Sequence, residues 1–336
     1  MVIDFRSDTV TKPTAGMLDA MMNAAVGDDV FGEDPSINEL EDMAAGLFGT
    51  ESALFSPSGT MSNQIGIRCH TVPGDEVICA SNAHVYIYEG GGIASNAGSQ
   101  VRAIEGDRGR ISAEQVLAAI NPDDVHKART SLVCLENTSN RGGGSCYSFD
   151  EIKKIRRICD EHGLQLHLDG ARLFNALVAK NETAAQYGAL FDSISVCLNK
   201  GLGCPIGSLL MGKTAFIKKA RRVRKVFGGG MRQAGFMAAA GIYALRHHVE
   251  RLALDHLMAK RIEEALAKKE FVRAVLPSET NIVIAETKLP AKEIASTLEE
   301  AGIRVIAISP YQIRFVTHLD ISGEMLEESL FRINKL

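Results

Sequence analysis

The feature that most limits the fold of this chain is a regular alternation of short apolar runs with stretches long enough to form helices. Apolar runs predict strands at 53–55, 76–80, 100–104, 131–135, 164–168, 193–198 and 208–211. Between most of them lie helix-length segments such as 150–162, where Ile152, Ile155 and Ile158 share one face. This order predicts an α/β fold with a mainly parallel sheet covered by helices on both sides. The close spacing of the last two runs predicts one antiparallel strand.

The pattern changes toward the C-terminus. A long helical region is expected from about 231 to 269. After Pro277, strands are expected at 281–285 and 313–316, and helices at 290–301 and 323–333. This arrangement predicts a small α+β unit. We therefore expect a large domain over residues 1–248 and a small C-terminal domain over residues 249–336.

Composition excludes several classes of partner. The net charge of −4 over 336 residues gives no basic field for nucleic acid or an anionic membrane. The N-terminus lacks the basic and apolar stretches of a secretory signal, and the most apolar window, 235–245, is too short to cross a bilayer. The seven cysteines are scattered without a CxxC pair, which is typical of reduced thiols in a cytoplasmic protein.

An acid and a lysine follow two of the predicted strands. Asp169 ends an apolar run and precedes Gly170 and Ala171, and Lys200 follows the run at 193–198. Ligands of open α/β sheets bind at the carboxyl ends of strands. A desolvated lysine can form a Schiff base with an aldehyde, and an acid beside a pyridine nitrogen keeps the ring electron-poor. The pair predicts a pyridoxal 5′-phosphate (PLP) site, although alone Asp169 would be read as a helix cap and Lys200 as a surface residue.

Two further segments supply what such a cofactor needs. Ser58, Gly59 and Thr60 lie between a strand and a helix, where free N–H groups and the helix dipole favour a phosphate. An ordinary capping turn would look the same. His84 follows the strand at 76–80, and its imidazole could stack on the cofactor ring and act as an acid or base.

Other motifs do not support a different chemistry. The glycines at 201–207 have the wrong spacing for a dinucleotide fingerprint and lead into a strand. The basic run at 218–225 is read as a solvated or interface helix face in an acidic chain. Histidines and cysteines show no ligand spacing, so no metal is expected.

Taken together, segments spread over the whole chain resemble the low-specificity L-threonine aldolase family. They are 4–11, 27–32, 135–138, 167–172, 199–203, 228–233 and 314–318. The resemblance implies the aspartate-aminotransferase-like fold, called PLP fold type I. It also implies retro-aldol cleavage of L-threonine, L-allo-threonine and related β-hydroxy-α-amino acids, in a homotetramer built from dimers with shared active sites.

The resemblance also implies roles for the cofactor residues. Lys200 would bind the PLP aldehyde, Asp169 would pair with the pyridine nitrogen, and His84 would stack on the ring. The phosphate would be held by Ser58, Gly59 and Thr60.

The remaining roles concern the substrate and a neighbouring subunit. Ser7, Arg172 and Arg314 would clamp the substrate carboxylate, with Arg172 also beside the cofactor. Lys225 and Arg232 would reach a neighbouring subunit's phosphate site. His126 matches a family histidine that would help with the substrate hydroxyl, so the base is left open between His84, His126 and a water.

Two departures and two alternatives accompany this reading. Many relatives have Tyr in place of Phe31 and His in place of Ser139, which bears on side-chain preference. An aminotransferase or a β-eliminating lyase would share the acid, the lysine and the phosphate turn. A non-catalytic nucleotide-binding α/β protein is the alternative from another class.

Overall fold

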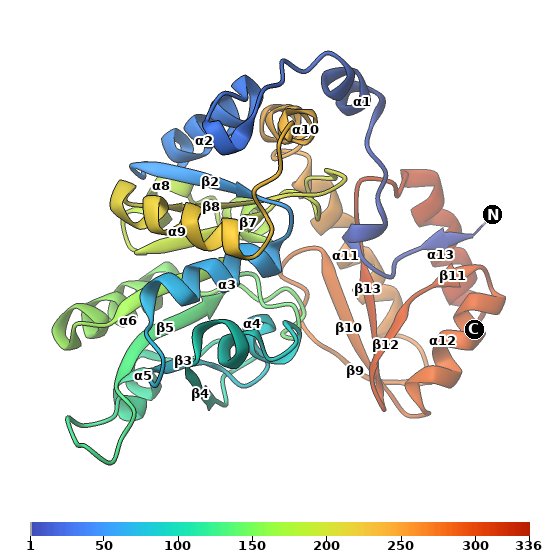
Figure 1. The fold of residues 1–336 in the computed structure, drawn as a ribbon. Helices are drawn as coiled ribbons and strands as arrows, with labels where there is room; N and C mark the ends of the chain where they lie inside the picture. Colours follow the sequence, from blue (N-terminus) through green and yellow to red (C-terminus); the bar gives the residue numbers. More distant parts are fainter. Residues whose placement is uncertain (1) are drawn as a thin grey trace.

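A computed structural model describes residues 2–336, and the two larger of its three sheets lie in separate parts of the molecule (Figure 1). The larger sheet has the strand order β2-β8-β7-β6-β5-β3-β4. Its strands are β2 (Ser52–Ser56), β3 (Glu76–Ala80), β4 (Gln100–Ile104), β5 (Thr130–Glu136), β6 (Gln165–Gly170), β7 (Ser193–Cys197) and β8 (Ser208–Gly212). Strand β8 is antiparallel to both of its neighbours, and the other pairs are parallel. The expected mainly parallel sheet with one antiparallel strand is therefore confirmed.

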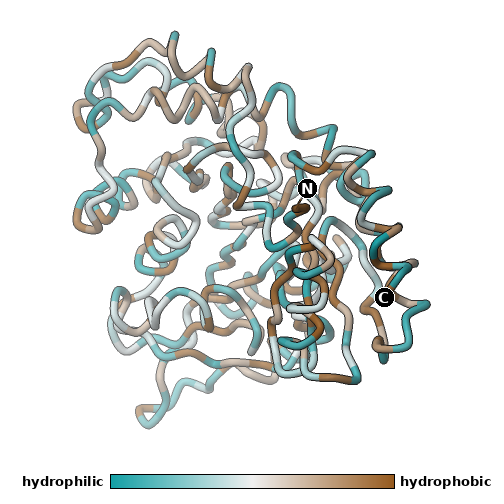
Figure 2. The backbone as a smooth tube through the Cα atoms, turned by 90° about the vertical axis from the view of Figure 1, so that its right-hand side faces the viewer, coloured by the Kyte–Doolittle hydropathy of each residue, from teal (hydrophilic) through white to brown (hydrophobic). Residues whose placement is uncertain are grey.

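Helices connect and cover these strands. They are α1 (Ala15–Met22), α2 (Pro35–Phe48), α3 (Gly59–His70), α4 (His84–Ile87), α5 (Ala113–Ala119), α6 (Phe149–His162), α7 (Leu173–Lys180), α8 (Ala184–Gly188), α9 (Thr214–Val226) and α10 (Gly235–His247). Short helical turns are η1 (Asp8–Val10), η2 (Asp29–Phe31) and η3 (Ile93–Ala97). Figure 2 shows hydrophobic and hydrophilic residues alternating along many of these segments, as helices with one buried face require.

The two faces of the large sheet bury different residues. Leu54 and Leu210 point toward Ile217 of α9 in a small core that also includes α3. Phe55 and Met211, their neighbours in sequence, belong to the main core on the other face. Because side chains alternate along a strand, this double coverage explains why the strands read as continuous apolar runs.

The C-terminal unit is built on an antiparallel sheet of order β12-β13-β10-β9. Its elements are α11 (Leu252–Leu266), β9 (Val272–Val275), β10 (Ile282–Thr287), α12 (Ala291–Glu300), β11 (Ile303–Arg304), β12 (Ile306–Ser309), β13 (Gln312–Val316) and α13 (Gly323–Lys335). The long helical region expected over 231–269 consists of two helices, because α10 ends at His247 and α11 begins at Leu252. Between them His248 turns inward, and its Nδ1 lies 2.8 Å from the carbonyl oxygen of Leu202.

The first residues of the chain pack with its last part. Strand β1 (Ile3–Asp4) pairs in parallel with β11, and both lie at the same side of the molecule (Figure 1). Ile3 and Phe5 are fully buried in the core of the C-terminal unit, where the rings of Phe5 and Phe315 lie 5.8 Å apart. The expected division at 248/249 placed this strand in the large domain, whereas the packing joins it to the small one.

Phe5→Ala should lower the free energy of unfolding by about 3–5 kcal/mol, because it removes a fully buried aromatic ring and leaves a cavity. Urea denaturation measures this loss. Val2→Ala, at a neighbouring exposed position, should change stability by less than about 0.5 kcal/mol. Equal effects of the two substitutions would show that the N-terminal strand does not belong to this core.

Candidate active site

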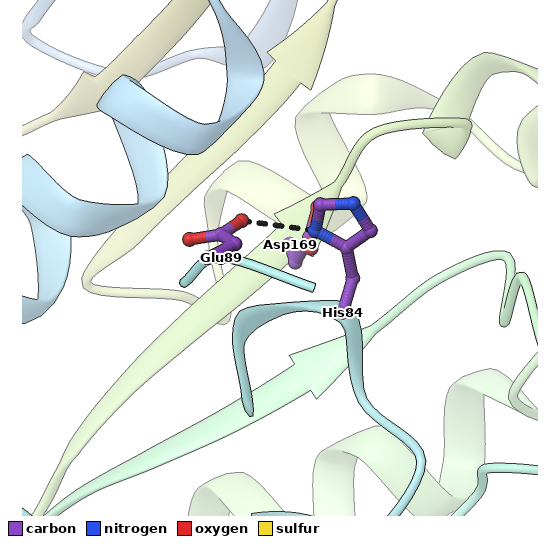
Figure 3. A group of neighbouring side chains, drawn as sticks. All are labelled: His84, Glu89 and Asp169. Carbon is purple, nitrogen blue, oxygen red and sulfur yellow. Dashed lines mark hydrogen bonds and ion pairs between the residues drawn. The ribbon is translucent and has the colours of Figure 1, made fainter. Parts of the chain in front are cut away.

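His84, Asp169 and Lys200, which the sequence predicts at the site, gather at the carboxyl edge of the large sheet, and Glu136, which was not predicted there, joins them. Glu136 ends β5, and it is paired in register with Asp169 near the end of β6. His84 begins α4 after β3, and Lys200 follows β7. Figure 3 shows His84 with Glu89 beside its ring and Asp169 close to both. The parallel pairing of β3, β5 and β6 thus brings together His84, Glu136 and Asp169, which are far apart in sequence.

Asp169 has one carboxylate oxygen without a partner. Its Oδ1 accepts a hydrogen bond from the N–H of Ala171 at 3.1 Å. Its Oδ2 is buried and accepts none from residues 2–336. A buried acceptor left without a donor is costly, so this atom is placed to receive a donor from a bound molecule.

Lys200 carries an amine that the protein does not engage. Its Nζ forms no hydrogen bond or ion pair within the described chain, although Asp8 and His84 lie within electrostatic range. The side chain is half-buried. An amine without a carboxylate partner remains available to react with a ligand carbonyl.

The start of α3 is shaped for an anion. Ser58 caps the helix, with its Oγ accepting a hydrogen bond from the N–H of Met61 at 3.2 Å. The helix start leaves the N–H groups of Gly59 and Thr60 without intrahelical acceptors. A Cβ at Gly59 would collide with Cys197 Sγ at the end of β7, so only glycine allows this close approach.

His84 is held from two sides. Its backbone N–H donates to Glu136 Oε2 at 3.1 Å, and its ring Nδ1 lies 3.0 Å from Glu89 Oε1. Burial lowers the pKa of His84, but the hydrogen bond to Glu89 and the charge of Asp169 outweigh it and raise the pKa above its ordinary value. Burial and the charge of Asp169 also raise the pKa of Glu136, to about 7.

These side chains could also be considered as metal ligands. One nitrogen or oxygen atom from each of His84, Glu89 and Asp169 lies within 4.8 Å of the other two. The hydrogen bond between His84 and Glu89 accounts for their approach without an ion. The expectation that no metal is bound stays a prediction.

Arg172 is already bound to an acid of the chain. Its Nε and Nη2 donate to the two oxygens of Asp8, both at 2.7 Å, and both side chains are buried. Burial alone would raise the pKa of Asp8, but Arg172, with a smaller contribution from Lys200, lowers it to about 2. The fork of Arg172 is thus occupied, and Nη1 is the donor left for the substrate clamp that the resemblance implied.

Arg314 is a buried cation without an acidic partner in the described chain. Its Nη1 donates to Asn140 Oδ1 at 2.7 Å and its Nη2 to the carbonyl oxygen of Arg6 at 3.1 Å. Because Ser7 follows Arg6 in the chain, the contact with Arg6 also brings the backbone of Ser7 near Arg314. Burial and the charge of Arg172 lower the pKa of Arg314 to about 10, so it stays protonated at neutral pH. An uncompensated buried guanidinium favours an anionic ligand.

A pocket of about 570 Å³ opens between the large sheet and the C-terminal unit. It is lined by His84, Tyr88, Asn140, Arg141, Ile306, Ala307, Ile308 and Arg314. The imidazole and the uncompensated guanidinium therefore face one space, which is large enough for an amino acid.

Three residues expected at the site are placed elsewhere within this chain. His126 lies in the loop that leads into β5, at the opposite end of that strand from Glu136, and its exposed ring contacts Asp124. Lys225 is exposed on α9. Arg232 pairs with Asp28 at 2.7 Å. A single subunit does not bring these side chains to Lys200, so a role for any of them requires a neighbouring subunit.

The two departures from the family pattern also lie outside the pocket lining. Phe31 is 72% exposed, and the guanidinium of Arg232 lies over its ring. Ser139 is fully buried, and its Oγ accepts from the N–H of Gly142 at 3.2 Å. Neither position contacts the space beside His84 in this chain.

Sequence reasoning missed Glu136, which was quoted only within a family motif, and two further acids of the site. Glu89 was not singled out, although an acid five residues after His84 and directly before three glycines is a usable signal. Asp8 was quoted only as part of a motif, and its pairing with Arg172 had no local signal. Asp8 and Glu89 each contact residues of other segments, Arg172 and α3 respectively. Local sequence patterns do not reveal such contacts.

Comparison with known proteins gives consistent results. The beta-eliminating lyase family profile matches residues 4–289. The low specificity L-threonine aldolase of Escherichia coli K12 is 44% identical, with 97% of each chain covered. A probable low-specificity L-threonine aldolase 2 of Arabidopsis thaliana is 41% identical over 99% of this chain and 97% of its own.

Solved structures give the same fold. A threonine aldolase from Leishmania major aligns with a TM-score of 0.87 at 22% identity, covering 99% of both chains. A serine palmitoyltransferase from Sphingomonas wittichii aligns with a TM-score of 0.77 at 15% identity, covering 99% of this chain and 86% of its own. The expected aspartate-aminotransferase-like fold, PLP fold type I, is confirmed.

Asp8→Asn should lower the free energy of unfolding at pH 7 by about 3–5 kcal/mol, because it leaves Arg172 buried without its counter-ion. The folded pKa of Asp8 is depressed to about 2. The stability that Asp8 adds is therefore present above its unfolded pKa of about 4 and is lost as pH falls toward 2. Melting temperatures between pH 2 and 7 should converge for the variant and the parent at the acid end.

Asp4→Asn is the control for this prediction. Asp4 pairs with Arg6 nearer the surface, so its loss should cost less than about 1 kcal/mol. If the difference in melting temperature between the parent and Asp8→Asn does not narrow at low pH, the role given to the Asp8–Arg172 pair is contradicted.

Proposed function

The chain belongs to the beta-eliminating lyase family and, within it, to the low-specificity L-threonine aldolases, and we propose that it cleaves L-threonine and L-allo-threonine to glycine and acetaldehyde, together with related β-hydroxy-α-amino acids. The observation that carries this proposal is the pocket that His84 and Arg314 share, with Asp169 close to His84 and Lys200 within electrostatic range of it. It offers a cation for the substrate carboxylate and an imidazole for its hydroxyl in one place.

The site fits pyridoxal 5′-phosphate. The unpartnered Oδ2 of Asp169 suits a protonated pyridine nitrogen, the free amine of Lys200 suits the aldehyde, and the turn at 58–60 suits the phosphate. When bound, this cofactor supplies an electron-poor ring that accepts the electron pair released at the substrate Cα. His84, at the same edge, would lie against the ring.

The cationic residues of the chain would orient the substrate. Arg314 would donate to its carboxylate. Arg314 also bonds the carbonyl oxygen of Arg6 and Arg172 bonds Asp8, so Ser7 lies in a segment held by both arginines. Holding the carboxylate sets which bond at Cα is aligned for cleavage. Asp8 neutralises Arg172, so Arg314 contributes most of the attraction.

A proton must leave the β-hydroxyl as the Cα–Cβ bond breaks. Of the two histidines considered, His84 lines the pocket of this subunit, whereas His126 does not. This placement supports His84 as the base. His126 would contribute only from another subunit.

Assembly and location complete the proposal. A homotetramer of two dimers would give the exposed Lys225 and Arg232 a place near a neighbouring subunit's phosphate. All seven cysteines are buried free thiols, which supports a reducing, cytoplasmic location. Among residues 2–336, every helix is too short or too polar to cross a membrane.

Lys200→Ala tests the reaction and the cofactor together. The parent with PLP should show a visible absorption band and release acetaldehyde from L-threonine, and the variant should lose the band and nearly all turnover. Lys213→Ala, at an exposed lysine, is the control and should keep both. A parent band without acetaldehyde would leave an aminotransferase or β-eliminating reaction, which keto-acid and pyruvate assays distinguish.

Arg314→Leu should raise KM for L-threonine about 10- to 100-fold, because a charge-assisted hydrogen bond to a carboxylate is lost. The Kd of PLP, measured by fluorescence, should change far less. Arg273→Leu removes a surface arginine paired with Glu286 and should leave KM unchanged. An unaltered KM in Arg314→Leu would remove Arg314 from the carboxylate clamp.

A further inference from the structure

Glu89 is a buried carboxylate at the edge of the pocket, and every contact it makes is with a donor. Its side chain has no exposed surface. Oε1 accepts from Asn63 Nδ2 at 2.9 Å and lies 3.0 Å from His84 Nδ1, and Oε2 accepts from Gln64 Nε2 at 2.6 Å. Figure 3 shows the carboxylate directed at the edge of the imidazole. Asn63 and Gln64 belong to α3, whose first turn forms the anion cradle, so Glu89 joins that helix to His84.

The direction of the hydrogen bonds beyond Asn63 can be worked out from this carboxylate. Because Asn63 donates its amide N–H to Glu89, its Oδ1 must accept. It does so from Ser195 Oγ at 2.7 Å and from His167 Nε2 at 3.1 Å. Full burial lowers the pKa of His167 to about 3, so this ring is neutral and carries its single proton on Nε2.

The same reasoning extends to the opposite edge of the sheet. His167 Nδ1 has no proton, so it accepts from Ser193 Oγ at 2.7 Å. The oxygen of Ser193 then accepts from His70 Nε2, also at 2.7 Å. In this series of hydrogen bonds, which runs from His70 to Glu89, every N–H or O–H points toward Glu89. Such aligned dipoles stabilise a buried negative charge without lysine or arginine.

An ionised Glu89 decides where His84 carries its proton. A carboxylate without a proton can only accept, so the Nδ1 of His84 must donate to it. In the neutral imidazole the other nitrogen, Nε2, then has a free lone pair.

We propose that Glu89 is a positioning residue for the cleavage reaction, holding His84 with its proton on Nδ1 so that Nε2 receives the proton of the substrate β-hydroxyl. The proposal rests on the proposed function. In this step the O–H bond breaks and an Nε2–H bond forms, while the O–H electron pair becomes the second bond of the aldehyde carbonyl. The Cα–Cβ electron pair stays with the glycine fragment, which takes up one proton, so no proton is consumed overall.

The charged groups around His84 set the pH range of this step. Its own segment contributes Tyr88 and Glu89. Four other segments contribute one group each, namely Glu136 on β5, Asp169 on β6, Lys200 after β7 and Arg314 on β13. The hydrogen bond to Glu89 is the largest influence that favours the protonated ring, and Lys200 opposes it. Loss of the carboxylate charge should therefore lower the pKa of His84.

Glu89→Gln in the PLP-loaded enzyme tests the proposal. In the pH profile of kcat/KM for L-threonine, the acidic limb should shift to lower pH by about one unit, because the carboxylate no longer favours the protonated ring of His84. Above the limb, kcat should fall about 10- to 100-fold, as expected when a base is weakened and poorly oriented. An unchanged limb together with unchanged kcat would overturn the proposal.

Glu41→Gln is the control, since Glu41 is another buried carboxylate, which accepts from the backbone N–H of Phe55 and pairs with Arg221 at 2.6 Å. It should change stability without moving the acidic limb. If Glu41→Gln moves the limb as far as Glu89→Gln does, the effect is a general result of losing a buried acid, and the proposal fails. PLP affinity, measured for both variants, separates a loss of cofactor from a loss of the base.

Nitrogen-15 NMR of the histidine side chains gives a readout that does not need turnover. In the parent, the neutral His84 ring should show a protonated Nδ1 and a bare Nε2, and Glu89→Leu should shift the proton toward Nε2. A parent ring with its proton on Nε2 would overturn the assignment. If L-threonine is not cleaved but the NMR result holds, the proposed function fails while the link between Glu89 and His84 stands.

Discussion

The site depends on the parallel register of β5, β6 and β7. Pairing of Glu136 with Asp169, and of Asp169 with Ser195, is set by backbone hydrogen bonds inside a sheet that is buried on both faces. A shift by one residue would turn these side chains to the other face of the sheet. Asp169, Lys200 and His84 therefore take their relative positions from the core, before any ligand contributes.

Some charged groups at this edge of the sheet are neutralised by the protein, and others are left without a partner. The cation of Arg172 is cancelled by Asp8, whereas Arg314 has only neutral acceptors. On the opposite side, Asp169 keeps one oxygen without a donor, and Glu89 is held by Asn63, Gln64 and His84 without a lysine or arginine. The protein thus leaves Arg314 without a counter-ion and Asp169 Oδ2 without a donor, which suits the carboxylate of an amino acid and the protonated ring nitrogen of the proposed cofactor.

The sequence predicts the large sheet well because each strand carries its own signal. The runs at 76–80 and 100–104 coincide with β3 and β4, and the strand ends place Asp169 and Lys200 correctly. Contacts between distant segments carry no such signal. Strand β1 pairs with β11 through a two-residue match, and Glu89 becomes part of the site only because α3 packs beside it. Nor can local sequence show that His126 lies at the wrong end of β5 within its own subunit.

The pairing of β1 with β11 also bears on the order in which the protein folds. Ile3 and Phe5 pack with residues 303–316, which lie very far along the chain from them. The large sheet closes shorter loops, since its strands lie between residues 52 and 212. Because contacts across long loops form slowly, we expect the segment that carries Asp8 to dock after the large sheet has formed. The buried charge of Arg172 is then neutralised late in folding, and the charge balance at this edge becomes complete only when the two units have met.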